Sequence, residues 1–147
     1  MKTKILVSAC LLGENCKYNG SNNKNEEVIR LAEKYELVPI CPECFGGLPI
    51  PRVPSELRNG RAYAKTGEDL TEFFNKGADH ALYIAMEANA PAAVLKENSP
   101  SCGFGKIYDG TFTGSKINGN GITAELLSQN GIRIFGESSV NKLLQLY

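Results

Sequence analysis

The chain has 147 residues, of which 42% are hydrophobic and 22% charged, values typical of one soluble globular domain spanning residues 1–147. Sixteen basic residues balance sixteen acidic ones, and this net charge of zero argues against a nucleic-acid polymer or an acidic membrane as the main partner. One histidine, His80, argues against a site built on several histidines. Five cysteines in so short a chain need an explanation.

The N-terminus resembles a secretory signal peptide, but its apolar stretch is too short to be one. Only Ile5, Leu6 and Val7 form the apolar stretch before Cys10, whereas a signal peptide needs roughly 7–15 such residues. No other run reaches the roughly 20 apolar residues of a membrane span. We therefore expect a cytoplasmic protein, in which clustered cysteines are more often metal ligands or catalysts than disulfides.

Strand and helix patterns alternate along the chain. Short apolar runs predict strands, and apolar residues at helical spacing predict helices. In chain order we expect a strand at 4–8, a helix at 23–35, a strand at 37–40, a helix at 66–88, a strand at 92–95, a helix at 122–129, a strand at 132–135 and a helix at 140–147.

Turn and cap residues refine this prediction. Asn25, followed by two glutamates, suits a helix N-terminus, and Thr66 is the expected cap of the long helix. Gly and Pro are dense in 41–61, which predicts a loop. The pair Asp109-Gly110 predicts a hairpin within 107–112.

This alternation predicts an α/β fold, a compact three-layer, Rossmann-like domain with a mainly parallel sheet. Such sheets bind ligands beyond the carboxyl ends of their strands. Cys10 follows the first strand, Cys41 and Cys44 follow the second, and Cys102 lies in the loop after the third. We therefore expect these thiols to meet at one edge of the sheet.

The cysteines by themselves leave three kinds of site open. Cys10, Cys41, Cys44 and Cys102 could form a closed zinc site without catalysis. The Cys41–Cys44 pair could be a thioredoxin-like redox motif, although the glycines that follow do not suit the helix that such a motif opens. A cluster with fewer than four protein ligands, or a fully ligated cluster in a redox carrier or sensor, is the third kind.

The neighbours of the cysteines add acid–base groups. Glu43 stands two residues after Cys41, and Ser101 is adjacent to Cys102 in a segment that also contains Ser99. A carboxylate and a hydroxyl beside a metal are what acid–base chemistry on a bound substrate requires. The donor fork of Arg52 suits an oxygen of a polar heterocycle.

Six segments together resemble the thiouracil desulfidase family, iron–sulfur enzymes that convert 2-thiouracil to uracil. The segments are VSACLLGENCKYNG from Val7, CPECFGGLPIPR from Cys41, TGEDLTEFFNKGA from Thr66, LKENSPSCG from Leu95, IYDGTFTG from Ile107 and GNGITAELLSQNGI from Gly119. They span nearly the whole chain in the family's order, and the chain resembles the family's single-domain form.

The resemblance implies a [4Fe–4S] cluster held by Cys10, Cys41 and Cys102, with the fourth iron open to the substrate sulfur. It implies that Glu43 and Ser101 handle protons and position a small thiolated base, whose sulfur is removed by non-redox hydrolysis. Arg52 and Ser99 are the expected substrate contacts. The resemblance predicts nothing about oligomeric state.

Two cysteines fall outside this ligand set. Cys44 stands where relatives often carry an aliphatic residue, so it is either a spare thiol or a fourth ligand that would close the cluster and suppress hydrolysis. Cys16 matches a frequent family cysteine, and we expect it to be an accessory rather than a ligand. The alternative to an enzyme is a structural zinc or iron–sulfur binding domain without hydrolase activity.

Overall fold

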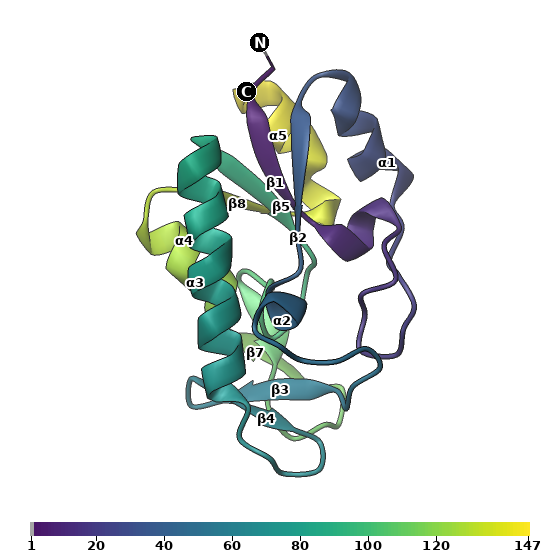
Figure 1. Cartoon of the computed structure of the whole chain (residues 1–147), viewed down its shortest axis with the longest axis vertical. Helices are drawn as coiled ribbons and strands as arrows, with labels where there is room; N and C mark the ends of the chain where they lie inside the picture. The colour runs from purple at the N-terminus through teal and green to yellow at the C-terminus, as the bar shows by residue number, and fades with distance from the viewer. Residues whose placement is uncertain (1) are drawn as a thin grey trace.

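The computed structural model describes residues 2–147, and its centre is a four-stranded parallel sheet (Figure 1). Its strands are β1 (Lys4–Ser8), β2 (Glu36–Ile40), β5 (Ala92–Leu95) and β8 (Arg133–Gly136). The strand order is β2-β1-β5-β8 with every pairing parallel, so the predicted α/β fold class is confirmed. Pro39 lies in the edge strand β2, the position in a sheet that tolerates a missing amide donor.

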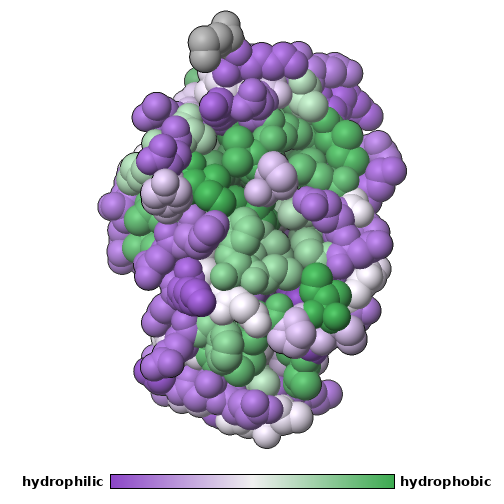
Figure 2. Space-filling model, viewed as in Figure 1, coloured by the Kyte–Doolittle hydropathy of each residue, from purple (hydrophilic) through white to green (hydrophobic). Residues whose placement is uncertain are grey.

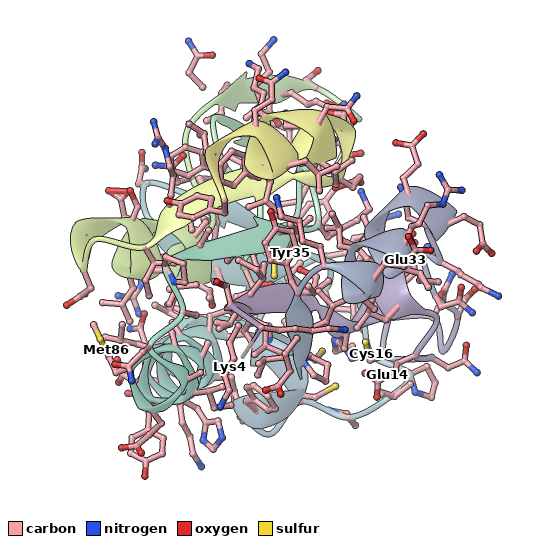
Figure 3. All side chains as sticks on the ribbon, turned by 90° about the horizontal axis from the view of Figure 1, so that it is seen from above. Lys4, Glu14, Cys16, Glu33, Tyr35 and Met86 are labelled. Atoms are coloured by element: carbon pink, nitrogen blue, oxygen red, sulfur yellow. The ribbon has the colours of Figure 1, made fainter. Side chains whose placement is uncertain are left out.

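Helices cover both faces of this sheet, as a buried parallel sheet requires. One face packs against α1 (Glu26–Ile29), its 3-10 continuation η2 (Arg30–Glu33) and α5 (Val140–Leu146). The other face packs against α3 (Thr71–Ala88) and α4 (Ile122–Gln129). Seen from above, α5 and α3 lie on opposite sides of the sheet (Figure 3).

Alternate residues of the central strands point to opposite faces and so build two cores. Ile5 and Val7 of β1 face the α1 and α5 side, and Leu6 faces α3. These three side chains are completely buried. The continuous apolar run in β1 is therefore explained by burial on both faces rather than by one solvent-exposed face.

Two short antiparallel hairpins lie beyond the sheet. The first pairs β3 (Ser55–Arg58) with β4 (Arg61–Ala64), and the second pairs β6 (Lys106–Tyr108) with β7 (Lys116–Asn118). The helix α3 extends from the sheet to the first hairpin (Figure 1). A small third core fixes this end and consists of Leu57, Ala62, Phe74 and Ile107.

One predicted loop and one predicted turn are wrong. The segment 41–61 is not all loop, because it contains the one-turn helix α2 (Pro42–Phe45) and the strand β3. The second hairpin does not turn at Asp109-Gly110, because β6 pairs with a strand that starts only at Lys116. Instead, Glu56 Oε1 accepts the amides of Gly110 and Phe112 at 3.0 and 3.1 Å, a tertiary contact that holds the longer connection.

Of the two predicted helix caps, one is confirmed and the other is wrong. Asn25 does cap α1, since its Oδ1 accepts the amide of Val28 at 3.1 Å. Thr66 does not cap α3, which begins at Thr71. Residues 61–64, which precede the expected cap, form β4 and pair with β3. At the observed start of α3, Asp69 Oδ1 accepts the Thr71 amide at 2.9 Å. The helix predicted at 23–35 is shorter, because α1 and η2 together cover only residues 26–33. The other predicted strands and helices agree with the structure to within one residue at each end.

The surface in the view of Figure 1 is hydrophilic around its rim, and hydrophobic residues gather towards its middle (Figure 2). Within residues 2–147, no helix combines the length and the apolar character needed to cross a membrane.

Close backbone contacts seat α2 on α3. A Cβ added at Gly77 would lie 1.8 Å from the carbonyl oxygen of Pro42, and one added at Gly46 would lie 1.9 Å from that of Phe73. Only glycine permits this approach from either side. Because α2 begins directly after Cys41 and contains Glu43, this contact sets the position of two candidate site residues.

We expect Gly77→Ala to lower the free energy of unfolding by about 1–3 kcal/mol, the usual cost of forcing extra volume into a packed interior. The direction is informative because an exposed Gly→Ala change inside a helix normally stabilises it by about 1 kcal/mol. Urea denaturation measures the change, with Lys76→Ala on the exposed face of α3 as the control. A stabilised Gly77→Ala protein would contradict the close packing of α2 on α3.

Candidate metal centre and active site

The carboxyl ends of β1, β2 and β5 bring three of the predicted site cysteines to one cleft. Cys10 lies in the 3-10 helix η1 (Ala9–Leu12) after β1, Cys41 directly follows β2, and Cys102 lies in the loop after β5. All three line a cleft of about 560 Å³. This size is within the range of roughly 300–1,000 Å³ for small-molecule sites. The strand-end rule thus predicted which segments meet.

The other four predicted site residues line the same cleft: Glu43, Arg52, Ser99 and Ser101. Glu43 Oε1 accepts a hydrogen bond from Arg52 Nε at 3.0 Å, and its Oε2 accepts one from Ser101 Oγ at 3.0 Å. The Glu43 and Arg52 side chains are only 16% and 7% exposed. The carboxylate is therefore held at both oxygens in a largely dry setting.

Most of the N–H donors of Arg52 bond to other groups of the protein. Its Nη2 donates to the carbonyl oxygen of Cys16 at 2.9 Å, and its Nη1 donates to that of Pro49 at 3.2 Å. Burial is the largest single influence and lowers the pKa of Arg52, but the Glu43 carboxylate and the sulfurs of Cys44 and Cys41 together leave that pKa above its ordinary value, so the guanidinium stays charged. Its geometry is that of a side chain that positions Glu43.

Ser101 is fixed from both sides of its loop. Ser99 Oγ lies 3.1 Å from Ser101 Oγ and accepts the amides of Ser101 and Cys102 at 3.2 and 3.1 Å. The amide of Thr123, at the start of α4, donates to the carbonyl oxygen of Ser101 at 2.9 Å. A Cβ at Gly121 would lie 2.5 Å from the carbonyl carbon of Ser101, so α4 presses directly on this loop.

Cys16 also lines the cleft, and it changes the protonation of its neighbours. Its thiol lowers the pKa of Cys10 to about 7 and that of Cys41 to about 6, in each case as the largest influence and against partial burial. The pKa of Cys16 itself is raised by its interactions with those two sulfurs. Cys10 and Cys41 are therefore prepared to act as thiolates, while Cys16 keeps its proton.

The last two cysteines differ sharply in position. Burial raises the pKa of Cys102 to about 12, although Ser8 and Ser101 oppose this by hydrogen bonding. A metal centre would thus have to displace its proton. Cys44 is not among the residues that line the cleft, and its Sγ lies 3.9 Å from Arg52 Nη1. Desolvation raises its pKa to about 11.

Asn23 and Lys96 are cleft residues that were not singled out from the sequence. Asn23 Nδ2 donates to Cys10 Sγ at 3.4 Å. Lys96 Nζ lies 2.9 Å from Glu137 Oε2 and 3.0 Å from the carbonyl oxygen of Glu97. The Asn23–Cys10 and Lys96–Glu137 contacts join separate segments of the chain, so no local pattern marks them. Lys96 does directly follow a strand whose end was expected to border the site.

The thiols of the cleft are a donor set that suits an iron–sulfur cluster or zinc. Thiolates are the ligands of zinc and of iron–sulfur clusters. Within residues 2–147, no three His, Cys, Asp or Glu side chains are grouped closely enough to hold a single metal ion.

Comparison with known proteins agrees with this chemistry. A family model described as 2-thiouracil desulfurase matches residues 5–139. An uncharacterized protein of Bacillus subtilis (strain 168), YbbK, is 45% identical over 150 residues, which cover 95% of this chain and 99% of the relative. A solved structure of the [4Fe-4S]-dependent thiouracil desulfidase TudS (DUF523Vcz) is 39% identical with a TM-score of 0.92, covering 98% of this chain and 97% of that one. Because the family model matches residues 5–139, nearly the whole chain, the chain belongs to the 2-thiouracil desulfurase family.

Proposed function

We propose that this protein removes sulfur by hydrolysis from a thiolated pyrimidine base such as 2-thiouracil, using a [4Fe–4S] cluster held by Cys10, Cys41 and Cys102. The observation that carries the proposal is the carboxylate–hydroxyl pair of Glu43 and Ser101, 3.0 Å apart, in a cleft lined by all three thiols. Family membership and the similarity to the TudS structure support removal of sulfur from such a base and the same cofactor.

When bound, such a cluster supplies a soft Lewis acid for the thione sulfur of the substrate. The three cysteines hold it as thiolates, and two of them already have a lowered pKa in the cleft. Cys44, which lies off the cleft wall, is proposed to be a spare thiol rather than a fourth ligand.

The acid–base work falls to Glu43. In the net reaction water adds across the C=S bond and hydrosulfide is then eliminated to leave C=O. One C–O bond forms, the C–S bond breaks, one water proton leaves on the sulfur, the other is released, and no oxidation state changes. Glu43 accepts the proton of the attacking water, and Ser101, bonded to Oε2, passes a proton between that carboxylate and the substrate. Both groups are in place before substrate arrives.

Arg52 and Ser99 hold the Glu43–Ser101 pair in position. Arg52 holds Oε1 of Glu43, and Ser99 orients the Ser101 hydroxyl. We propose that each acts mainly as a positioning residue, while any remaining donor of Arg52 is available for an oxygen of the base. Their role as direct substrate contacts stays a prediction.

The ligand assignment predicts the metal content of four variants. After anaerobic reconstitution, the unaltered chain should hold about four iron and four acid-labile sulfide. Cys10→Ser, Cys41→Ser and Cys102→Ser should each lose most of this iron, because a cluster ligand is removed. Cys44→Ser is the matched control and should keep both the iron and the visible absorption. One zinc per chain without sulfide would instead support a structural metal domain.

Replacing the proposed base should leave the cluster and stop the chemistry. Glu43→Gln is expected to lower kcat for hydrosulfide release from 2-thiouracil by about 10²–10⁴-fold, the usual contribution of a general base. Its iron content should match that of the unaltered chain. Glu56→Gln removes another cleft carboxylate, one bonded to backbone amides, and should cost far less. A Glu43→Gln protein with normal kcat would refute the assignment of the base.

The burial of the Arg52–Glu43 pair predicts a stability effect in the protein without its cluster. Arg52→Met leaves the Glu43 carboxylate buried without its partner and should cost about 3–5 kcal/mol in urea denaturation. Arg52→Met combined with Glu43→Gln should recover part of this loss, since the second change removes the unpaired charge. Arg61→Met breaks the exposed pair with Asp69 and should matter much less. Equal losses for the two arginines would show that burial does not decide the effect.

A further inference from the structure

Asn23 contacts Cys10 through both its backbone and its side chain. Its amide nitrogen donates to the carbonyl oxygen of Cys10 at 2.9 Å, and its Nδ2 donates to Cys10 Sγ at 3.4 Å. We propose that Asn23 is a positioning residue for the metal centre: its side-chain amide stabilises negative charge on the Cys10 sulfur and so raises the reduction potential and the retention of the cluster. This inference rests on the proposed cluster function.

The loop is held in place without the Asn23 side chain. Gly13 also donates its amide to the Cys10 carbonyl, at 3.2 Å, and the amide of Asn25 donates to the carbonyl oxygen of Leu11 at 2.9 Å. The side chain of Asn25 separately caps α1. These contacts dock residues 23–25 on η1 through the backbone. The side chain of Asn23 is therefore free to serve the sulfur, and its removal leaves the chain in position.

The three proposed ligand sulfurs have different polar neighbours. Cys10 receives an amide N–H at 3.4 Å, whereas the hydroxyl of Ser101 lies 3.9 Å from Cys102 Sγ. Cys16 does not distinguish Cys10 from Cys41, because its thiol is the neighbour with the largest influence on the pKa of both. An amide N–H is the strongest permanent dipole of the three and carries no titrating proton at neutral pH.

The electrostatic consequence has a definite sign. A donor aimed at a thiolate favours whichever state carries more negative charge, and one-electron reduction adds such charge to a cluster. Hydrogen bonds to ligand sulfurs are accordingly among the factors that set cluster potentials. Lys96 also lies on this cleft, but its ammonium is already paired with Glu137. The neutral amide of Asn23 is thus a non-titrating donor that Cys10 receives in addition to the thiol of Cys16, which it shares with Cys41.

Redox titration followed by electron paramagnetic resonance tests the proposal on the reconstituted full chain. Asn23→Leu keeps the size and removes the donor, and Asn23→Asp keeps the shape but presents a carboxylate to the sulfur. We expect the unaltered chain to have the highest reduction potential, Asn23→Leu a lower one because the donor is lost, and Asn23→Asp the lowest because a negative charge faces the sulfur. Iron release to a chelator should speed up by about 10–100-fold, the usual effect of losing such a partner of a metal ligand.

Asn22→Leu is the matched control, because Asn22 bonds Asn15 and the amide of Lys24 rather than the cleft. It should keep the original potential and iron-release rate. A variant of Asn23 that loses all iron while Asn22→Leu keeps it would support the proposal. Unchanged potential and iron release in Asn23→Asp, or equal shifts in the Asn22 variant, would overturn it.

The outcomes separate this inference from the proposed function. A loaded cluster with unshifted Asn23 variants overturns only the role of Asn23. A loaded cluster with shifted variants and no release of hydrosulfide from 2-thiouracil overturns only the reaction. A chain that takes up no iron overturns both.

Discussion

The buried ion pair between Arg52 and Glu43 ties together the segments that carry the thiols. Glu43 follows Cys41 by two residues and bonds Ser101, the residue next to Cys102. Arg52 bonds the carbonyl oxygen of Cys16 in the loop that leads away from Cys10. One guanidinium and one carboxylate therefore connect three loops that leave three different strands. Because each charge is largely shielded from water, neither tolerates loss of its partner.

Tight packing around this pair limits where it can sit. The reciprocal glycine contacts between α2 and α3 leave no room for α2 to move closer to α3. On the other side, the first amides of α4 are satisfied by carbonyl oxygens of the loop that carries Ser101. Catalytic geometry held by backbone contacts of this kind is preorganised, which is the property that makes a fixed base and hydroxyl effective.

The thiols of the cleft are chemically unequal because their surroundings are unequal. Cys10 and Cys41 share the proton-bearing neighbour Cys16 and have a lowered pKa, while burial raises the pKa of Cys102. Metal binding to such a set must release the proton of the buried thiol, so assembly and pH are linked. Cys16, which looked like an accessory in the sequence, acts on two proposed ligands without being counted among them.

Local sequence was sufficient for the parts of this protein that depend on periodicity and caps. The apolar run at Ile5–Val7, the cap at Asn25 and the helix at Ile122–Gln129 follow from short-range physics, and strand-end placement predicted that Cys10, Cys41 and Cys102 meet. The turn of the second hairpin and the start of α3 depended on long-range bonds from Glu56 and on pairing of β4, which no local window contains. The same holds for Asn23 on Cys10 and for Arg52 on Glu43. Residue types determined which chemistry was available, and only tertiary packing decided which side chains touch, because those contacts join segments that the sequence keeps apart.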